Sequence, residues 1–176
     1  NERTLVISPH IDDEVLGCGG IFSRFQNTIK FKVVFIAEGS SARFPNDSSK
    51  DCIDEIIHRT QCAKRALSYL GVEDVSILNL PCCNLDKTGH LEVNKIIEKE
   101  ISIFQPDSNQ DHHIVYNSSI IATRPGSGVN NLISYEVLSS TEWGFSDPFC
   151  PTLFFSLSDG NVDQKVEAMK FYDTEV

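Results

Sequence analysis

The sequence predicts an α/β domain in which helices flank a mostly parallel sheet, and two observations predict it. Short apolar runs rich in β-branched residues, typical of strands buried on both faces, alternate along the chain with longer segments of helical periodicity. Polar or glycine-containing stretches separate these runs. Strands that alternate with helices favour parallel pairing through helical crossovers. Ligands of such folds bind beyond the carboxyl ends of the strands, so we expect a site there.

The first half of the chain supplies the clearest elements. Residues 4–8 (TLVIS) are the first predicted strand because the run is apolar and β-branched. The pattern from residue 12 to about residue 25 predicts a helix, whose glycines would let it lie close to the sheet. Residues 32–37 (KVVFIA) predict the second strand. The polar loop at 40–51 follows, and we expect it near the site as a lid or specificity element.

A long amphipathic helix at 53–70 is predicted to end at Gly71, a usual signal for a helix C-terminus. The later predicted elements are a strand at 75–80, helices at 91–104 and 114–123, strands at 133–138 and 153–157 and a helix at 162–172. We expect one domain over 1–176. A parallel sheet usually has another strand between the helices at 91–104 and 114–123, so either this fold does without that strand or a segment near 107–109 is lacking.

Composition and charge limit the function classes. The 176-residue chain has 40% hydrophobic and 23% charged residues, an ordinary globular composition, and its net charge of −10 argues against nucleic acid as the main partner. No apolar run reaches the roughly 18 residues of a membrane span. None of the six cysteines forms a C-x-x-C pair, which argues against a structural zinc knuckle. We expect all six to be reduced, as in a cytoplasmic protein.

The stretch SPHIDDEVLGCGG at 8–20 carries the strongest chemical signal, because it places a histidine and three adjacent carboxylates directly after a predicted strand. His10 and Asp13 are three residues apart at a strand-to-helix turn and can converge on one point. An imidazole nitrogen and a carboxylate oxygen are typical zinc ligands. A dication and a helix N-terminus would also relieve the repulsion among Asp12, Asp13 and Glu14.

A third ligand is expected from NQDHH at 109–113, where Asp111 and His112 precede a predicted helix. A His/Asp/His set leaves coordination positions open for water and substrate, as catalytic zinc sites do. Zinc acidifies its bound water, and Asp12, next to a ligand but pointing differently, is the natural base.

Structural explanations compete with this interpretation. Three acidic residues before a helix can be only an N-cap with charges that suit the helix dipole. Isolated histidines are usually surface residues, and we expect His58 and His90 to be exposed, since neither has a matching partner spacing. The glycines at 17–20 lie inside the helical pattern, not directly after the strand as a dinucleotide-binding loop requires, and Cys18 among them favours packing.

The stretch PHIDDEVLGCGG at 9–20 resembles the P/A-H-x-D-D-E-x-L-G-x-G-G signature of the PIG-L/LmbE-like zinc N-deacetylases, and NQDH at 109–112 resembles their H/N-x-D-H segment. Further similar stretches are EGSSAR at 38–43, RTQCAKRALSYLG at 59–71, ATRPG at 122–126 and YEVLSSTEW at 135–143. The resemblance covers nearly the whole chain, and its first motif is highly specific. It implies a Rossmann-like α/β fold and hydrolysis of an N-acetyl group, usually on an N-acetylglucosamine-type sugar.

Position by position, the resemblance implies zinc ligands at His10, Asp13 and His112 and a general base at Asp12. Zinc is the implied cofactor, although a His/Asp/His site also accepts Fe²⁺ or Co²⁺.

Four further residues are implied to support the site. Arg59, together with Arg43 of the EGSSAR stretch, would lie near the substrate. Glu14 and Asp111 would lie behind the ligands and orient them.

The chain also departs from the family pattern. Asn109 stands where many members have a histidine that assists the tetrahedral intermediate or the leaving group. Asparagine can donate a hydrogen bond, so Asn109 or Arg59 is the candidate that stabilises the oxyanion of the intermediate. Asparagine cannot shuttle a proton, so Asp12, once protonated, is the candidate acid in place of the histidine. Cys82 and Cys83 replace an acidic residue after the third strand, which would alter the substrate pocket. The family also continues beyond the position of Val176.

Three functions therefore remain open. The first is a metal-dependent deacetylase acting on an N-acetylglucosamine-type sugar or glycoconjugate. The second is an amidase for another amide, such as a thiol conjugate. The third is a sugar-binding homologue with impaired catalysis. The partner in each is a small molecule, and the oligomeric state, a homo-oligomer included, is open.

Overall fold

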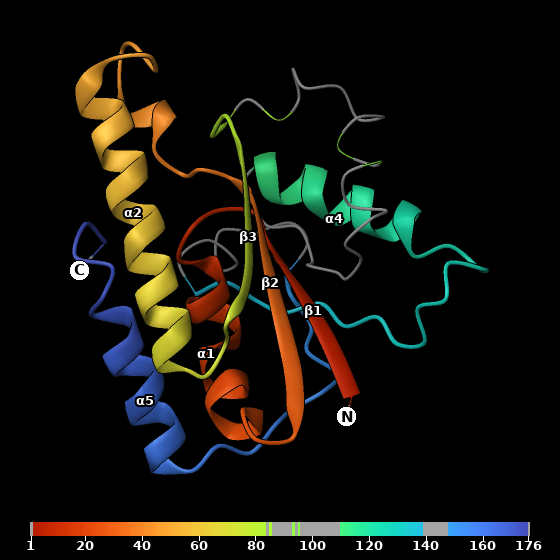
Figure 1. Cartoon of the computed structure of the whole chain (residues 1–176). Helices are drawn as coiled ribbons and strands as arrows, with labels where there is room; N and C mark the ends of the chain where they lie inside the picture. The colour runs from red at the N-terminus through yellow and green to blue at the C-terminus, as the bar shows by residue number, and fades with distance from the viewer. Residues whose placement is uncertain are drawn as a thin grey trace.

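The computed structural model describes residues 2–83, 85, 93, 95, 110–138 and 148–175, and Figure 1 shows its arrangement. Its elements in chain order are β1 (Glu2–Ser8), α1 (Asp13–Phe25), β2 (Ile29–Ala37), the 3₁₀ turn η1 (Ser41–Arg43), α2 (Lys50–Tyr69), β3 (Asp74–Leu80), α4 (Gln110–Ala122) and α5 (Asp159–Met169). The predicted α/β class is therefore confirmed.

The described strands form a parallel sheet in the order β1-β2-β3. Ile7 of β1 is paired in register with Val34 of β2, and Phe35 of β2 with Ile77 of β3. Both crossovers run in the same direction across the sheet, and right-handed crossovers then bring both connecting helices to one face. Helices α1 and α2 accordingly cover the same face, while α4 lies on the other (Figure 1).

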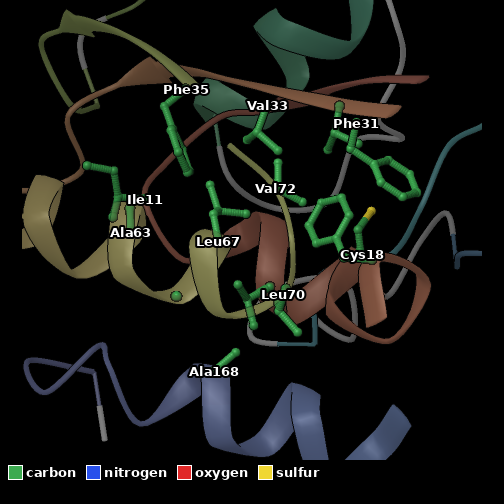
Figure 2. Packing of buried hydrophobic residues seen from close by; sticks show 14 of the residues in the cluster. Ile11, Cys18, Phe31, Val33, Phe35, Ala63, Leu67, Leu70, Val72 and Ala168 are labelled. Atoms are coloured by element: carbon green, nitrogen blue, oxygen red, sulfur yellow. The ribbon is translucent and has the colours of Figure 1, made fainter. Parts of the chain in front are cut away.

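Two hydrophobic cores follow from the alternation of side chains along β2. Val33 and Phe35 point into the first core, which α1, α2 and Ala168 of α5 close; Figure 2 shows this packing. Val34 and Ile36 point into the second core, against residues of α4. Because both faces of β2 are buried, its sequence is a continuous apolar run rather than an alternating one, as the strand prediction assumed.

The helix ends have local causes. The Ser49 side chain accepts a hydrogen bond from the Cys52 N–H, so α2 begins inside the loop predicted at 40–51. Gly71, with φ of 78°, follows the end of α2. Ser158 and Asn161 form a capping box that begins α5 at Asp159, three residues before the predicted start.

The strands predicted at 133–138 and 153–157 are wrong, because neither segment is in strand conformation. Tyr135 instead packs its ring against Gly17 and donates a hydrogen bond to the Ile7 carbonyl. The Phe155 ring meets Phe25 edge to face. These apolar segments thus use side-chain contacts with α1 and β1, and β-propensity alone does not provide a strand partner.

Other predictions differ in their bounds or fall elsewhere. The predicted helix at 91–104 lies outside the described residues except for Val93 and Lys95, which are helical. The helix predicted at 114–123 begins earlier, at Gln110, and so includes Asp111 and His112.

In the parts of the chain that the structure describes, no helix combines the length and apolarity needed to cross a membrane.

Candidate metal centre

The candidate site lies at the carboxyl edge of the sheet, where the residues that follow neighbouring strands meet. His10 follows β1, Glu38 follows β2 and Cys82 follows β3. The Glu38 carboxylate ties two of these segments together, since it accepts hydrogen bonds from the backbone N–H groups of Ser40 and Ser41 and from that of Cys82, at 2.6, 2.9 and 2.8 Å. The first turn of α4 completes the edge from the other side of the sheet (Figure 1).

Three predicted ligands converge here. Asp13 Oδ2 lies 3.4 Å from His10 Nδ1 and 3.1 Å from His112 Nε2, and the two imidazole nitrogens are 3.3 Å apart. All three residues are buried. Donors that bind zinc tetrahedrally at about 2.0–2.1 Å are roughly 3.3–3.4 Å apart, so the spacing of these atoms fits one cation.

Asp111 fixes the orientation of His10. Its Oδ2 forms a 2.9 Å hydrogen bond with His10 Nε2 and also accepts from the Cys83 N–H at 2.6 Å. This bond leaves Nδ1 of His10 facing Asp13 and His112. A carboxylate that holds the second nitrogen of a histidine is a common support of metal-binding histidines.

The charges in this cluster compensate each other. Burial alone would raise the pKa of Asp13, but His112 and His10 outweigh it and hold that pKa well below its usual value. Burial works to lower the pKa of His10, while hydrogen bonds with Asp111, Asp13 and Cys82 outweigh it and raise that pKa well above 6.5. The buried donors thus depend on opposite charges around them, and a dication would take the place of the protons.

Asp12 is not among the three converging donors, and it has unusual backbone geometry. Its φ of 118° is a conformation that L-residues rarely adopt, and such outliers are typical of functional sites. Its Oδ2 lies 3.3 Å from Arg59 Nη2. Burial, with the nearby charge of Asp13, raises the pKa of Asp12 well above its usual value although Arg59 opposes this. A carboxylate of raised pKa is a stronger base.

Glu14 turns into the protein rather than toward the histidines. Its Oε2 accepts the Asp12 N–H at 3.0 Å, and its Oε1 accepts the Tyr172 hydroxyl. Burial raises the pKa of Glu14 to about 7, although both hydrogen bonds work against the rise.

The two arginines predicted to bind substrate meet at one carboxylate. Arg59 is fully buried and donates to the carbonyls of Gly39 and Ile11, at 3.1 and 2.5 Å. Glu175 Oε1 lies 2.7 Å from Arg59 Nη1 and 2.6 Å from Arg43 Nη2. Through these contacts Arg59 holds in place the two loops beside Asp12. A contact of Arg59 or Arg43 with a substrate stays a prediction.

Cys82 offers a second donor set, because His10, Cys82 and Asp111 also lie within reach of one another. Its sulfur lies 3.6 Å from that of Cys83, and the six cysteines of the chain are free thiols. His10 belongs to both donor sets.

The structure brings most of the predicted residues together and adds three. His10, Asp12, Asp13, Glu14, Arg43, Arg59, Asp111 and His112 lie around this edge, while Asn109 lies outside the described residues. The sequence interpretation missed Glu38, Tyr172 and Glu175. The place of Glu38 at the end of a predicted strand could have indicated it, whereas the last two contact the site from the far end of the chain.

Comparisons with known proteins agree with this geometry. The model of the family "GlcNAc-PI de-N-acetylase" (PIG-L) matches residues 5–123, which include every candidate metal ligand of this site. The chain is 28% identical over 184 residues to the uncharacterized deacetylase YaiS of Escherichia coli K12, covering 94% of this chain and 88% of that protein.

Solved structures share the fold at low identity. N,N'-diacetylchitobiose deacetylase from Pyrococcus horikoshii superposes with a TM-score of 0.70 at 19% identity, covering 99% of this chain and 71% of its own. A deacetylase of teicoplanin biosynthesis gives a TM-score of 0.75 at 16% identity, with coverage of 98% and 84%. Because the family model spans more than half of the chain, the chain belongs to the GlcNAc-PI de-N-acetylase (PIG-L) family of deacetylases.

Proposed function

We propose that the chain hydrolyses the N-acetyl group of an N-acetylglucosamine-type sugar or glycoconjugate, giving acetate and an amino sugar, with a divalent metal, zinc first, held by His10, Asp13 and His112. The observation that carries the proposal is the triangle of donor atoms, with edges of 3.1, 3.3 and 3.4 Å. Such a cation, when bound, polarises the amide carbonyl and lowers the pKa of water beside it.

The residues of the chain have separate tasks in this proposal. Asp13 and the two histidines bind the metal, and Asp111 keeps His10 turned toward it. Asp12 takes the proton of the attacking water, a role that suits a carboxylate whose pKa burial raises. Asp12 then returns the proton to the leaving amine, since asparagine at position 109 cannot supply one.

Two further parts of the proposal have separate support. The charged residues beside the site support a small polar substrate, and the cysteines support a cytoplasmic location. Arg43 is partly exposed beside the buried Arg59, and their shared carboxylate Glu175 could yield to a polar substrate group. The six free thiols fit a reducing compartment, which is why we place the protein in the cytoplasm.

The test is acetate release from a panel of free, lipid-linked and nucleotide-linked N-acetylglucosamine compounds and one thiol-conjugate amide. Zinc-loaded protein, chelator-treated protein and the Asp12→Asn variant are compared. We expect metal-dependent release that falls by about 10²–10⁴-fold in Asp12→Asn, since that is the usual contribution of a general base.

Asp54→Asn is the matched control, because Asp54 is an exposed aspartate on α2. Full activity in Asp12→Asn would remove Asp12 from the mechanism. Release from the thiol conjugate alone would favour the amidase, and no release from any compound by zinc-loaded protein would favour a binding homologue.

A further inference from the structure

A second group of metal-binding side chains lies away from this site, between α2 and the segment that follows α5. His58 Nε2 lies 2.6 Å from Asp173 Oδ1, and Cys62 Sγ lies 3.6 Å from the same nitrogen and 3.8 Å from the same oxygen. His58 and Cys62 are four residues apart, one turn of α2, so both project from the same side of the helix. Figure 1 shows the C-terminal segment alongside α2.

The geometry argues against a cysteine–histidine–aspartate relay. In a relay the thiol and the carboxylate contact different nitrogens of the imidazole, so that a proton can pass across the ring. Here both contact Nε2 of His58. The Cys62 side chain is also buried, with 1% of the residue exposed, so its sulfur is not accessible to a substrate. The three donors converge on a point, as ligands do.

The separations suit zinc. With a Zn–S distance of about 2.3 Å and Zn–N and Zn–O distances of about 2.0–2.2 Å, sulfur lies roughly 3.5 Å from its neighbouring ligands. The two measured separations from Cys62 are close to this value. The His58 and Asp173 atoms would have to separate further, and both side chains can adjust because they are 40% and 59% exposed.

We propose that His58, Cys62 and Asp173 form a second divalent metal site for a thiolate-binding cation such as Zn²⁺, with the fourth position open to water. One feature opposes binding: Arg65 Nη2 donates to Cys62 Sγ at 3.3 Å. This guanidinium would turn aside toward the Phe171 ring, from whose centroid its Cζ is 5.8 Å. The neighbouring positive charge makes this site the weaker of the two.

A cation here would fasten the end of the chain to α2. Asp173 lies between Tyr172, which donates to Glu14, and Glu175, which pairs with Arg59 and Arg43. Metal binding at the second site therefore stabilises the segment that supports Asp12 and Glu14 from behind. It requires no assumption about the reaction of the first site.

The experiment titrates metal-stripped protein with Co²⁺ and, separately, with Zn²⁺. Thiolate-to-cobalt charge-transfer absorption reports the second site, because the His/Asp/His donors of the first contain no sulfur. We expect two equivalents in the wild type and one in His58→Gln, Cys62→Ser and Asp173→Asn, each of which also loses the thiolate absorption. His10→Gln loses the other equivalent and keeps the absorption.

Matched controls are His113→Gln and Asp163→Asn, because both replace exposed residues of the same types on other helices and should bind two equivalents. The surface variants His58→Gln and Asp173→Asn decide the result if Cys62→Ser fails to fold. The proposal is overturned if the wild type binds one equivalent that His10→Gln abolishes. It is also overturned if the thiolate absorption survives Cys62→Ser and disappears in Cys82→Ser, since the cobalt would then use the donor set of His10.

Discussion

Three adjacent acidic residues can coexist after β1 because each carboxylate has different partners. Asp13 faces the two histidines, Asp12 faces Arg59, and Glu14 binds the Tyr172 hydroxyl. The sequence could predict that Asp13 faces His10, since a histidine three residues before an aspartate at a helix start indicates that both side chains can bind one metal ion. It could not predict Tyr172 as the partner of Glu14, because no local pattern links residues so far apart in the chain.

Asp111 provides the residue-scale prediction. Asp111→Asn replaces the carboxylate that orients His10 by an amide, and we expect zinc affinity at the first site to fall by about 10–100-fold. The measurement is competition with a chelator in a His58→Gln background, so that one site remains.

A control variant shows whether a loss of zinc affinity in Asp111→Asn comes from the carboxylate at that position. Asp54→Asn in the same background should bind zinc as tightly as the background protein, because its side chain is exposed on α2. Unchanged affinity in Asp111→Asn would show that His10 needs no carboxylate to bind metal.

At the scale of elements, the predicted strands and helices that alternate along the first half of the chain are present, because each buries a continuous or periodic apolar face. The failures are the segments at 133–138 and 153–157. The apolar residues of both segments predicted strands, but the Tyr135 and Phe155 side chains pack against α1. A hydrophobic pattern indicates that a segment is buried. It does not indicate whether the backbone of that segment forms hydrogen bonds with a neighbouring strand.

The close contact of α1 with Tyr135 gives the element-scale prediction. A Cβ added at Gly17 would overlap the Tyr135 ring and lie 2.9 Å from the Glu136 carbonyl oxygen. We expect Gly17→Ala to lower the free energy of unfolding by about 1–3 kcal/mol, the usual cost of overpacking, as measured by denaturant unfolding.

Gly160 is the matched control for Gly17, because it lies in α5 and an added Cβ there meets only the Ser158 hydroxyl oxygen at 3.9 Å. Gly160→Ala should raise stability by about 0.5–1 kcal/mol, since alanine favours the helix. Equal effects of the two substitutions would mean that helix propensity, and not the contact with Tyr135, decides the outcome at Gly17.

At the scale of the molecule, segments that lie far apart in the sequence meet at one site. The strand β1 and the start of α1 supply His10, Asp12, Asp13 and Glu14, while the segment after α5 supplies Tyr172 and Glu175. The sequence predicted the carboxyl edge of the sheet as the site, because that rule depends only on strand order and direction. The return of the C-terminal segment to this edge depends on packing of α5 against α1, which sequence periodicity does not specify.

Tyr172 tests whether this return stabilises the whole molecule. Tyr172→Phe removes the hydroxyl that donates to Glu14 and leaves that buried carboxyl with the Asp12 N–H. We expect the free energy of unfolding to fall by about 1–3 kcal/mol, the cost of leaving a buried polar group without a partner. Denaturant unfolding of metal-stripped protein measures it. Tyr69→Phe, at a tyrosine that is 45% exposed on α2, should change stability by less than about 0.5 kcal/mol. If the two variants unfold alike, the contact between Tyr172 and Glu14 does not fasten the C-terminal segment, and the stability of the site depends on the sheet and α1 alone.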